Sequence, residues 1–188
     1  MMKHKPISRR DFLKNIGIAG TGVLLATSPW LSAFSEVTHT SNEKCRLGII
    51  GPGSRGRFLM SFLVQNPKVD IVALCDIYQP SIDEGLKLAP KAKVYGDYRK
   101  LLEDKNIDAV LVATPLSSHC QIVMDAFDAG KHVFCEKTIG FTMEECFRMY
   151  NKHISTGKIF FSGQQRLFDP RYIKTMEMIH AGTFGEIN

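Results

Sequence analysis

The chain has 188 residues, of which 44% are hydrophobic and 23% charged. This length and composition suit one globular domain with its own core and argue against a disordered chain. The formal net charge is +5, but the first 35 residues contain five basic side chains and one acidic one, so the remainder is nearly neutral. The excess charge belongs to the N-terminus, and we expect no nucleic-acid partner.

Residues 1–35 have the layout of a signal peptide, with a basic stretch before a short apolar one. The apolar stretch over 16–26 is shorter than the roughly 20 residues that cross a bilayer. Small side chains at Ala33 and Ser35 predict cleavage after Ser35. The run S-R-R-D-F-L-K resembles the twin-arginine export signal, which implies export through the twin-arginine translocase to the periplasm or beyond. A basic amphipathic helix and an uncleaved membrane anchor are the alternatives.

Five cysteines require attention in an exported protein, because the environment outside the cytosol is oxidising. Cys45 should begin the first strand and Cys75 should end the second. In parallel neighbouring strands these positions lie roughly 15 Å apart, too far for a disulfide. The sequence contains no C-x-x-C pair and no Cys/His metal spacing. We therefore expect buried, unreactive thiols and no metal site.

A polar stretch over 36–44 reads as a linker, and short apolar runs rich in Val, Ile and Leu follow it. Continuous apolar runs of this length are typical of strands that are covered on both faces of a sheet. The predicted strands are Cys45–Ile50, 69–76, Lys93–Tyr95, 108–114, 132–136 and 159–163.

Helical patterns separate these runs. Thr142 and Glu145 resemble a capping box that opens a helix, and Gly130 and Gly157 stand where helices would end. Apolar side chains also recur at helical spacing over 58–63 and 122–127. The alternation predicts an α/β fold with a doubly wound parallel sheet, the Rossmann fold, over residues 45–167.

The run G-P-G-S-R-G after the first predicted strand satisfies G-x-G-x-x-G. Gly51 allows the tight turn, Gly53 lets a pyrophosphate approach the backbone, and Gly56 lets the helix pack on the sheet. The amides at the helix start, where Ser54 stands, would face the phosphate. The preceding strand, the following helix and Asp76, about twenty residues further on, strengthen this interpretation over that of an ordinary strand-to-helix turn.

Asp76 should accept hydrogen bonds from the adenosine ribose, and its carboxylate would repel a 2′-phosphate. That favours NAD as the cofactor. Arg55 leaves NADP open, because a nearby guanidinium can hold a phosphate. A solvated loop charge is the equally weighted alternative for Arg55.

The run V-A-T-P-L-S-S-H leaves the fourth strand and enters a helix. Ligands of doubly wound sheets lie beyond the carboxyl ends of the strands, so Thr114 and Pro115 should touch the cofactor. His119 is either a site residue or an ordinary histidine at a helix start. Glu136 and Lys137 end a buried strand, where charges are uncommon. Lys137 could donate a proton or hold a substrate hydroxyl; alternatively both charges simply face water.

Several of these motifs occur together in one known family. I-G-P-G-S-R-G-R, A-L-C-D, V-A-T-P-L-S-S-H, G-K-H-V-F-C-E-K and the later Q-Q-R and F-D-P resemble the N-terminal domain of the glucose–fructose oxidoreductase, inositol dehydrogenase and rhizopine-catabolism dehydrogenase family. The resemblance implies an NAD(P) cofactor and a sugar or cyclitol substrate. It places Glu136 and Lys137 at the family's Glu-Lys-Pro motif, with Lys137 as the catalytic group beside the nicotinamide. It places Arg166 near the cofactor or the domain junction.

Two features depart from the family pattern. Thr138 replaces the motif's proline, and because a cis bond before a non-proline costs about 3–4 kcal/mol, we expect a trans bond and leave the orientation of Lys137 open. Residues 168–188 resemble the start of the connection to a second, α+β domain, which would supply most of the substrate pocket. We therefore expect the chain to be part of a longer protein, homo-oligomeric when complete.

Three functions fit the sequence. The first is an exported NAD(P)-dependent oxidoreductase that acts on a sugar or cyclitol hydroxyl. The second is an NAD-dependent glycoside hydrolase that oxidises its sugar transiently and so regenerates its own cofactor. The run T-M-E-E-C resembles that branch, whereas the retained Lys137 fits a dehydrogenase better. The third is a non-catalytic sensor of a dinucleotide or a sugar.

Overall fold

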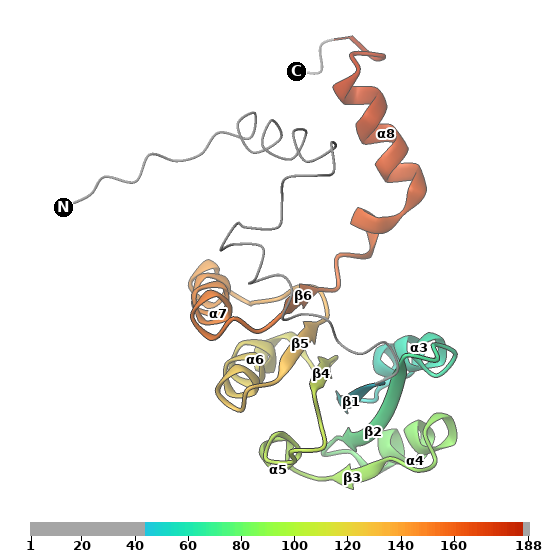
Figure 1. Cartoon of the computed structure of the whole chain (residues 1–188), viewed down its shortest axis with the longest axis vertical. Coiled ribbons are helices and arrows are strands. Elements are labelled where there is room, and N and C mark those ends of the chain that lie inside the picture. The colour runs from blue at the N-terminus through green and yellow to red at the C-terminus, as the bar shows by residue number, and fades with distance from the viewer. Residues whose placement is uncertain (1–43, 186–188) are drawn as a thin grey trace, which may run out of the picture. The chain divides into compact units, whose positions relative to one another are not determined.

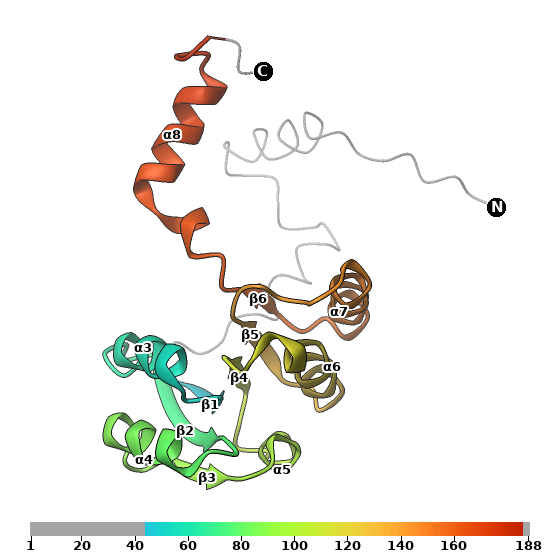
Figure 2. The same cartoon turned by 180° about the vertical axis from the view of Figure 1, so that it is seen from behind.

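The computed structural model describes residues 44–185, and these residues contain a six-stranded parallel sheet. The strands run in the order β3-β2-β1-β4-β5-β6, so the chain starts in the middle of the sheet and builds outward in both directions (Figures 1 and 2). This order confirms the predicted doubly wound Rossmann fold. The strands are β1 (Cys45–Ile50), β2 (Val69–Cys75), β3 (Lys93–Tyr95), β4 (Ala109–Val112), β5 (His132–Cys135) and β6 (Phe160–Ser162).

Helices cover both faces of the sheet (Figure 1). Helices α3 (Ser54–Leu63) and α4 (Gln79–Leu88) lie on one face, and α5 (Tyr98–Leu102), α6 (His119–Asp128) and α7 (Met143–Thr156) lie on the other. Two short 3₁₀ turns, η2 (Leu116–Ser118) and η3 (Gln165–Phe168), precede α6 and α8 (Pro170–His180), respectively. No residue of α8 is buried.

The core divides into two apolar clusters, one on each side of the sheet. Successive residues of one strand contribute to different clusters: Ile49 packs with Met60 of α3 and Ile82 of α4, whereas Ile50 packs with Val123 and Phe127 of α6. Side chains of successive strand residues point to opposite faces, so a strand covered on both sides must be apolar throughout. The continuous apolar runs of the sequence therefore have a direct structural cause.

Local signals fixed the helix ends as expected. The hydroxyl of Thr142 accepts from the Glu145 amide, and the Glu145 carboxylate accepts from the Thr142 amide, which completes the predicted capping box of α7. Gly157 ends α7 with φ +64°, and Gly130 follows α6 with φ +72°. Both glycines have the left-handed conformation that a helix end uses and that other residues seldom adopt.

The strands end earlier than the apolar runs that predicted them. β4 ends at Val112 and β5 at Cys135, so Thr114 and Glu136 lie in the loops that follow. The shorter strands matter for function because loops at the carboxyl ends of the strands form the ligand sites of this fold.

All five thiols are free, as expected, because Cys45 and Cys75 stand at opposite ends of paired strands. Burial raises the pKa of the Cys75 and Cys135 thiols to about 12, and Cys120 is also buried. The expectation that every thiol is buried was wrong for Cys45, which is exposed, and for Cys146, which is partly so. Cys45 is the first residue of its strand, at the amino edge of the sheet.

The predicted export signal and almost all of the predicted linker lie outside the described residues. Within 44–185, none of the helices combines the length and the apolar character that a membrane crossing requires.

Candidate functional site

The loops after four adjacent strands begin in a row at the carboxyl edge of the sheet. Each loop's first amide donates to the last carbonyl of a neighbouring strand: Gly51 to Cys75 at 2.8 Å, Ala113 to Ile50 at 2.9 Å, Glu136 to Val112 at 2.9 Å and Gly163 to Cys135 at 2.8 Å. The regular hydrogen bonding between parallel strands thus aligns loops that are far apart in sequence. The row brings the glycine turn, the Thr114 loop and the Glu136–Lys137 loop to one edge.

The three glycines of the turn have separate structural reasons. Gly51 has φ +89°, and a Cβ there would lie 2.8 Å from the carbonyl carbon of Ala113. A Cβ on Gly56 would lie 2.2 Å from the Gly51 carbonyl oxygen, so only glycine lets α3 approach the strand this closely. A Cβ on Gly53 would meet nothing within 4 Å. The fold therefore requires Gly51 and Gly56, whereas the space at Gly53 is open for a ligand.

That open space adjoins the start of α3, where the backbone is suited to an anion. Gly53 caps the helix without a side-chain hydrogen bond, and the first turn, which begins at Ser54, contains no acidic residue. The first amides of a helix lack partners within the helix, and its dipole attracts negative charge. An open approach at Gly53 together with an acid-free helix start fits the pyrophosphate of a dinucleotide.

Asp76 stands directly after β2, on one side of this turn. Its Oδ1 accepts a hydrogen bond from the Tyr78 amide at 3.0 Å, which fixes the direction of the carboxylate, and the side chain is only half-buried. The bond from the Gly51 amide to the Cys75 carbonyl places Asp76 next to the glycine turn. A ribose that extends from the turn over β2 would meet this carboxylate.

Arg55 points to the other side. Its Nη2 lies 2.7 Å and its Nε 2.8 Å from Oε1 of Glu136, and its guanidinium carbon lies 5.0 Å from the ring centre of Phe58. Glu136 follows β5, which is separated from β2 by β1 and β4. The guanidinium is therefore directed away from Asp76 and is paired, which corrects the picture of a simple solvated charge.

Glu136 is buried, and both of its carboxylate oxygens have partners. Oε1 receives Arg55, and Oε2 accepts the amide of Lys137 at 2.9 Å. Gly163, at the end of β6, supports this arrangement, because a Cβ there would lie 3.1 Å from the Glu136 Cα. Gly163 was not predicted as a site residue; its only signal in the sequence is a glycine at the end of the last predicted strand.

The Thr114 loop and the Lys137 loop are joined by a buried histidine. His119 begins α6, with Nε2 2.9 Å from the Thr114 carbonyl oxygen and Nδ1 2.9 Å from the Thr138 carbonyl oxygen. Because carbonyl oxygens only accept, both contacts are hydrogen bonds only when both ring nitrogens carry a proton. His119 is thus both the first residue of a helix and part of the site, where its ring holds two loops together.

Ser118 completes this loop, a second contact that sequence analysis did not identify. Its hydroxyl lies 2.8 Å from the Thr114 hydroxyl oxygen and 2.8 Å from the Pro115 carbonyl oxygen. Pro115 itself is exposed. Ser118 and His119 therefore fix the Thr114–Pro115 backbone by hydrogen bonds, while Pro115 is exposed to solvent.

Lys137 is exposed beside the buried Glu136, so its ammonium is free to meet a ligand while its backbone is fixed. The peptide bond between Lys137 and Thr138 is cis, so the expectation of a trans bond was wrong. The preference of an isolated peptide does not decide a bond whose neighbouring carbonyl is held by His119.

Arg166 lies apart from the residues described so far. It is exposed on η3, its guanidinium carbon lies 5.2 Å from the ring centre of Tyr172, and it donates to the Tyr172 hydroxyl. It therefore interacts with the first turn of α8. The structure brings together Arg55, Glu136, Lys137, Thr114 and His119, with the glycine turn between this group and Asp76.

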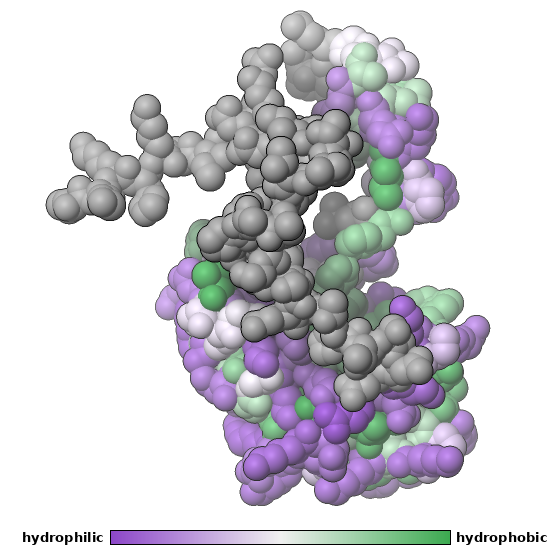
Figure 3. All heavy atoms as spheres, viewed as in Figure 1, coloured by the Kyte–Doolittle hydropathy of each residue, from purple (hydrophilic) through white to green (hydrophobic). Residues whose placement is uncertain are grey.

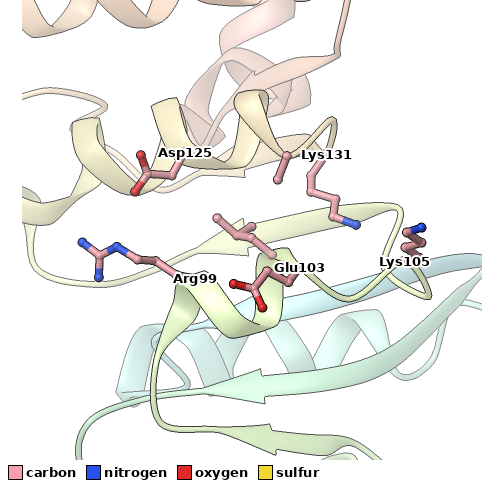
Figure 4. A pocket seen from close by; sticks show the side chains of 7 residues that line it. Arg99, Glu103, Lys105, Asp125 and Lys131 are labelled. Atoms are coloured by element: carbon pink, nitrogen blue, oxygen red, sulfur yellow. The ribbon is translucent and has the colours of Figure 1, made fainter.

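A hollow of about 530 Å³ lies away from these residues, elsewhere on the domain (Figure 4). It is formed by α5, the loop before β4, the end of α6 and Lys131, so it lies at the amino ends of the strands. The Lys131 ammonium donates to the carbonyl oxygens of Asp104 and Ile107 at 2.7 and 2.8 Å, and its burial lowers its pKa. This lysine is already bonded to two loop carbonyls, and the hollow is distinct from the candidate site.

Within 44–185, no group of three or more Cys, His, Asp or Glu side chains could hold a metal ion.

Comparison with known proteins agrees with this geometry. The family described as "Oxidoreductase family, NAD-binding Rossmann fold" matches residues 45–164. A glycosyl hydrolase family 109 protein from Stenotrophomonas maltophilia is 30% identical over 193 residues, which cover 96% of this chain and 40% of that protein. Myo-inositol 2-dehydrogenase from Thermotoga maritima is 32% identical over 141 residues, covering 75% of this chain and 42% of that protein.

Among solved structures, scyllo-inositol dehydrogenase from Lactobacillus casei with bound NAD(H) and scyllo-inositol superposes with a TM-score of 0.72 at 26% identity. The match covers 77% of this chain and 43% of that one. The chain thus spans less than half the length of the relatives that it matches.

Proposed function

The chain belongs to the oxidoreductase family with an NAD-binding Rossmann fold, and from that membership we propose that it forms the cofactor-binding part of an enzyme that oxidises a sugar or cyclitol hydroxyl. The observation that carries the proposal is the exposed Lys137 beside the phosphate turn, on a loop fixed by Glu136 and His119. Because the loop is anchored at two points, the lysine extends from a fixed backbone position. A group held in this way can act on one defined atom of a substrate.

The residues of this chain would divide the cofactor between them. The open backbone at Gly53 and the helix start at Ser54 would hold the pyrophosphate, and Asp76 would accept from the adenosine ribose. Thr114 and Pro115 would line the path toward the nicotinamide. When bound, the nicotinamide accepts or returns the hydride. We expect NAD rather than NADP, because Arg55 is paired with Glu136 and faces away from Asp76.

Lys137 would manage the proton of the reacting hydroxyl. As a hydroxyl-bearing carbon gives up its hydride, the hydroxyl must lose a proton, and the reverse reaction must supply one. The backbone amide of Lys137 is held by Glu136 Oε2, while the side chain extends into solvent from the same carboxyl edge. In the oxidising direction the Lys137 side chain would accept the hydroxyl proton as a neutral amine, and in the reverse direction it would donate that proton to the oxygen as an ammonium. Glu136 would fix the backbone from which this side chain extends.

A second candidate function is NAD-dependent glycoside hydrolysis. It is supported by the relative called a glycosyl hydrolase family 109 protein, which matches 96% of this chain, against 75% for the inositol dehydrogenase. In that reaction the cofactor returns to its starting state after each cycle. A non-catalytic sensor is the third candidate, and it would bind the dinucleotide or a sugar without turnover.

One set of measurements separates these functions. Calorimetry on the 188-residue chain should show NAD binding, because the glycine turn, Asp76 and the Thr114 loop all lie within it. The full-length protein is then assayed with a panel of cyclitols, free sugars and chromogenic glycosides. NADH that accumulates with a polyol supports the dehydrogenase, glycoside cleavage without net NADH supports the hydrolase, and binding without either supports the sensor. A folded chain that does not bind NAD would refute the proposal.

Residues 1–35 would act as the twin-arginine export signal, 36–44 as a linker, 45–167 as the cofactor domain and 168–188 as the connection to a further domain. The run S-R-R-D-F-L-K supports the export proposal. Fusing residues 1–35 to a reporter that is active only outside the cytoplasm tests it, with Arg9 and Arg10 both changed to Lys as the control. Export that survives this change would contradict a twin-arginine route.

A further inference from the structure

Two thiols from neighbouring helices approach each other near the start of each helix. Cys120 lies in the first turn of α6 and is buried, and Cys146 lies near the start of α7 and is partly exposed. The Cys120 Sγ lies 4.0 Å from the carbonyl oxygen of Glu145, the residue bonded to Cys146. Since a carbonyl oxygen lies about 3 Å from the Cα of the next residue, the Cys120 sulfur is within about 7 Å of the Cys146 Cα. Rotation of these short side chains and a small shift of the helix starts would permit a disulfide.

Both helix starts also contact the loop over residues 136–142, between β5 and α7, which we call the Lys137 loop. A Cβ on Gly140 would lie 2.9 Å from the Cys146 Sγ and 3.2 Å from the Cys146 amide nitrogen, so Cys146 packs directly on this loop. Cys120 follows His119, whose Nδ1 lies 2.9 Å from a carbonyl oxygen of the same loop. A bond between the two thiols would therefore act on the loop that carries Lys137.

We propose that Cys120 and Cys146 form a reversible disulfide by exchange with a low-molecular-weight disulfide such as oxidised glutathione, and that this bond loosens the Lys137 loop. In the first step the Cys146 thiolate attacks the small disulfide, so that Cys146 bonds to one of its sulfurs and the other leaves as a thiolate. In the second step the Cys120 thiolate attacks the Cys146 sulfur and displaces the remaining small thiolate. The two protein thiols lose two electrons and two protons in all, and the reagent is reduced to two thiol molecules.

The unequal exposure of the two thiols sets the order of these steps. Helix α7 is the last helix of its layer and lies beside α6 in both views (Figures 1 and 2). Hydrophilic residues lie along much of the rim where Figure 1 places these helices (Figure 3), so a polar reagent can approach from water. Cys120 is only 5% exposed, and burial raises the pKa of its thiol. Cys146 therefore meets the reagent first, and Cys120 resolves the mixed disulfide.

Mass spectrometry identifies the bond directly, because trypsin separates the thiols. Cleavage after Lys and Arg leaves Cys120 in peptide 106–131, Cys135 in 132–137 and Cys146 in 138–148. The 188-residue chain is incubated with oxidised glutathione, and the remaining thiols are alkylated before digestion. We expect peptide 106–131 to be joined to 138–148, and dithiothreitol to separate them. A folded chain without this link, or one in which either peptide is joined to 132–137 instead, would overturn the proposal.

Single variants test the order of attack. Cys120→Ser should accumulate glutathione on Cys146, because the resolving thiol is absent, whereas Cys146→Ser should leave Cys120 unmodified. Cys45→Ser is the matched control, since it removes an exposed thiol at the amino edge of the sheet and should leave the cross-link unchanged. Circular dichroism confirms that the variants fold. Glutathione on Cys120 in the Cys146→Ser variant would contradict the order.

Hydrogen exchange tests the effect on the Lys137 loop. The Phe141 amide donates to Oε2 of Glu145 at 2.6 Å, and a bond from Cys146 to Cys120 would shift Glu145 and take the Cys146 sulfur from Gly140. Amides 138–142 should therefore exchange several times faster in the oxidised chain than in the reduced one, and Cys146→Ser should show no such change. No cofactor or substrate takes part, so this holds whatever reaction the protein catalyses. Unchanged exchange in a cross-linked chain would overturn the effect on the loop.

Discussion

Arg55 and Glu136, which are 81 residues apart in the chain, form an ion pair that joins the turn after β1 to the end of β5, with Nη2 2.7 Å from Oε1. The Glu136 side chain is 5% exposed and that of Arg55 38%. The pair connects the loop that would hold the cofactor phosphates to the loop that carries Lys137. Through it, the two halves of the candidate site are placed relative to each other.

Substituting Arg55 and substituting Glu136 should lower the free energy of unfolding by different amounts. Arg55→Gln leaves a buried carboxylate without its cation, which should destabilise the fold on the order of 2–4 kcal/mol. Glu136→Gln leaves a guanidinium that can turn toward water, so its cost should be about 1 kcal/mol. Denaturant unfolding of both single variants and the double variant measures the costs and the coupling. Equal costs, or no coupling in the double variant, would show that the pair is not formed.

Gly51 and Gly53 should fail in different ways when a methyl group is added. Gly51→Ala forces a side chain into φ +89° against the Ala113 backbone and should lower stability by at least about 2 kcal/mol. Gly53→Ala meets open space and should fold normally, yet weaken NAD binding at least tenfold, because its methyl group occupies the approach to the pyrophosphate. Thermal unfolding and calorimetry separate the two effects. Normal NAD affinity in Gly53→Ala would move the phosphate site elsewhere.

Asp76 should decide which dinucleotide binds. Asp76→Ser removes a negative charge from beside the ribose 2′ position, and one neighbouring like charge is worth about 3 kcal/mol at an effective dielectric constant of about 20. The affinity for NADP should therefore rise relative to that for NAD. Asp83→Ser, on the exposed surface of α4, is the control. Competition binding measures the ratio, and an unchanged ratio would mean that the ribose does not reach Asp76.

Lys137 should be needed for turnover and not for binding. Lys137→Met in the full-length protein keeps most of the side-chain length and removes the charge and the proton. NAD affinity should survive, because the phosphate turn is a separate loop, while turnover should fall by about 10²–10⁴. Lys68→Met, at the amino edge of the sheet, should leave turnover unchanged. If binding is lost together with turnover, the lysine is structural; if turnover is unchanged, Lys137 is not at the reacting atom.

Asp108 should make the fold sensitive to acid. Hydrogen bonds from Arg46, at 2.6 Å and 2.9 Å, hold the pKa of the Asp108 carboxyl below its usual value. A lowered folded pKa stabilises the fold above the unfolded pKa, and this contribution is lost as pH falls through the folded pKa. Asp108→Asn should cost at most about 1 kcal/mol at neutral pH, because both side chains are partly exposed.

Unfolding by urea at neutral and at strongly acidic pH checks this prediction. The stability gap between the wild type and Asp108→Asn should shrink at acidic pH. A gap of the same size at both values would show that the charge of Asp108 has no role.

The order of the elements and the ends of some helices could be predicted from the sequence because their causes are local. A strand covered on both faces is apolar throughout, and Thr142 and Glu145 are three residues apart. Within one short turn, Gly51 adopts φ +89° and Gly56 avoids a clash with the Gly51 carbonyl. The right-handed, short connections of an α/β chain then leave the doubly wound sheet as the expected architecture. The Rossmann fold and the position of the glycine turn followed from these signals alone.

The partners of the site residues were decided only by the tertiary structure. Which carboxylate Arg55 meets, which carbonyls His119 joins and which conformation the Lys137–Thr138 bond adopts all depend on loops that the strand order brings together. The exposed face of α7 was likewise undecided, since the helix has apolar residues on two faces and only packing shows which one is buried. Local sterics and hydrogen bonding act within a few residues and are written in the sequence. Contacts between distant loops depend on the relative placement of whole elements, which no short stretch of sequence contains.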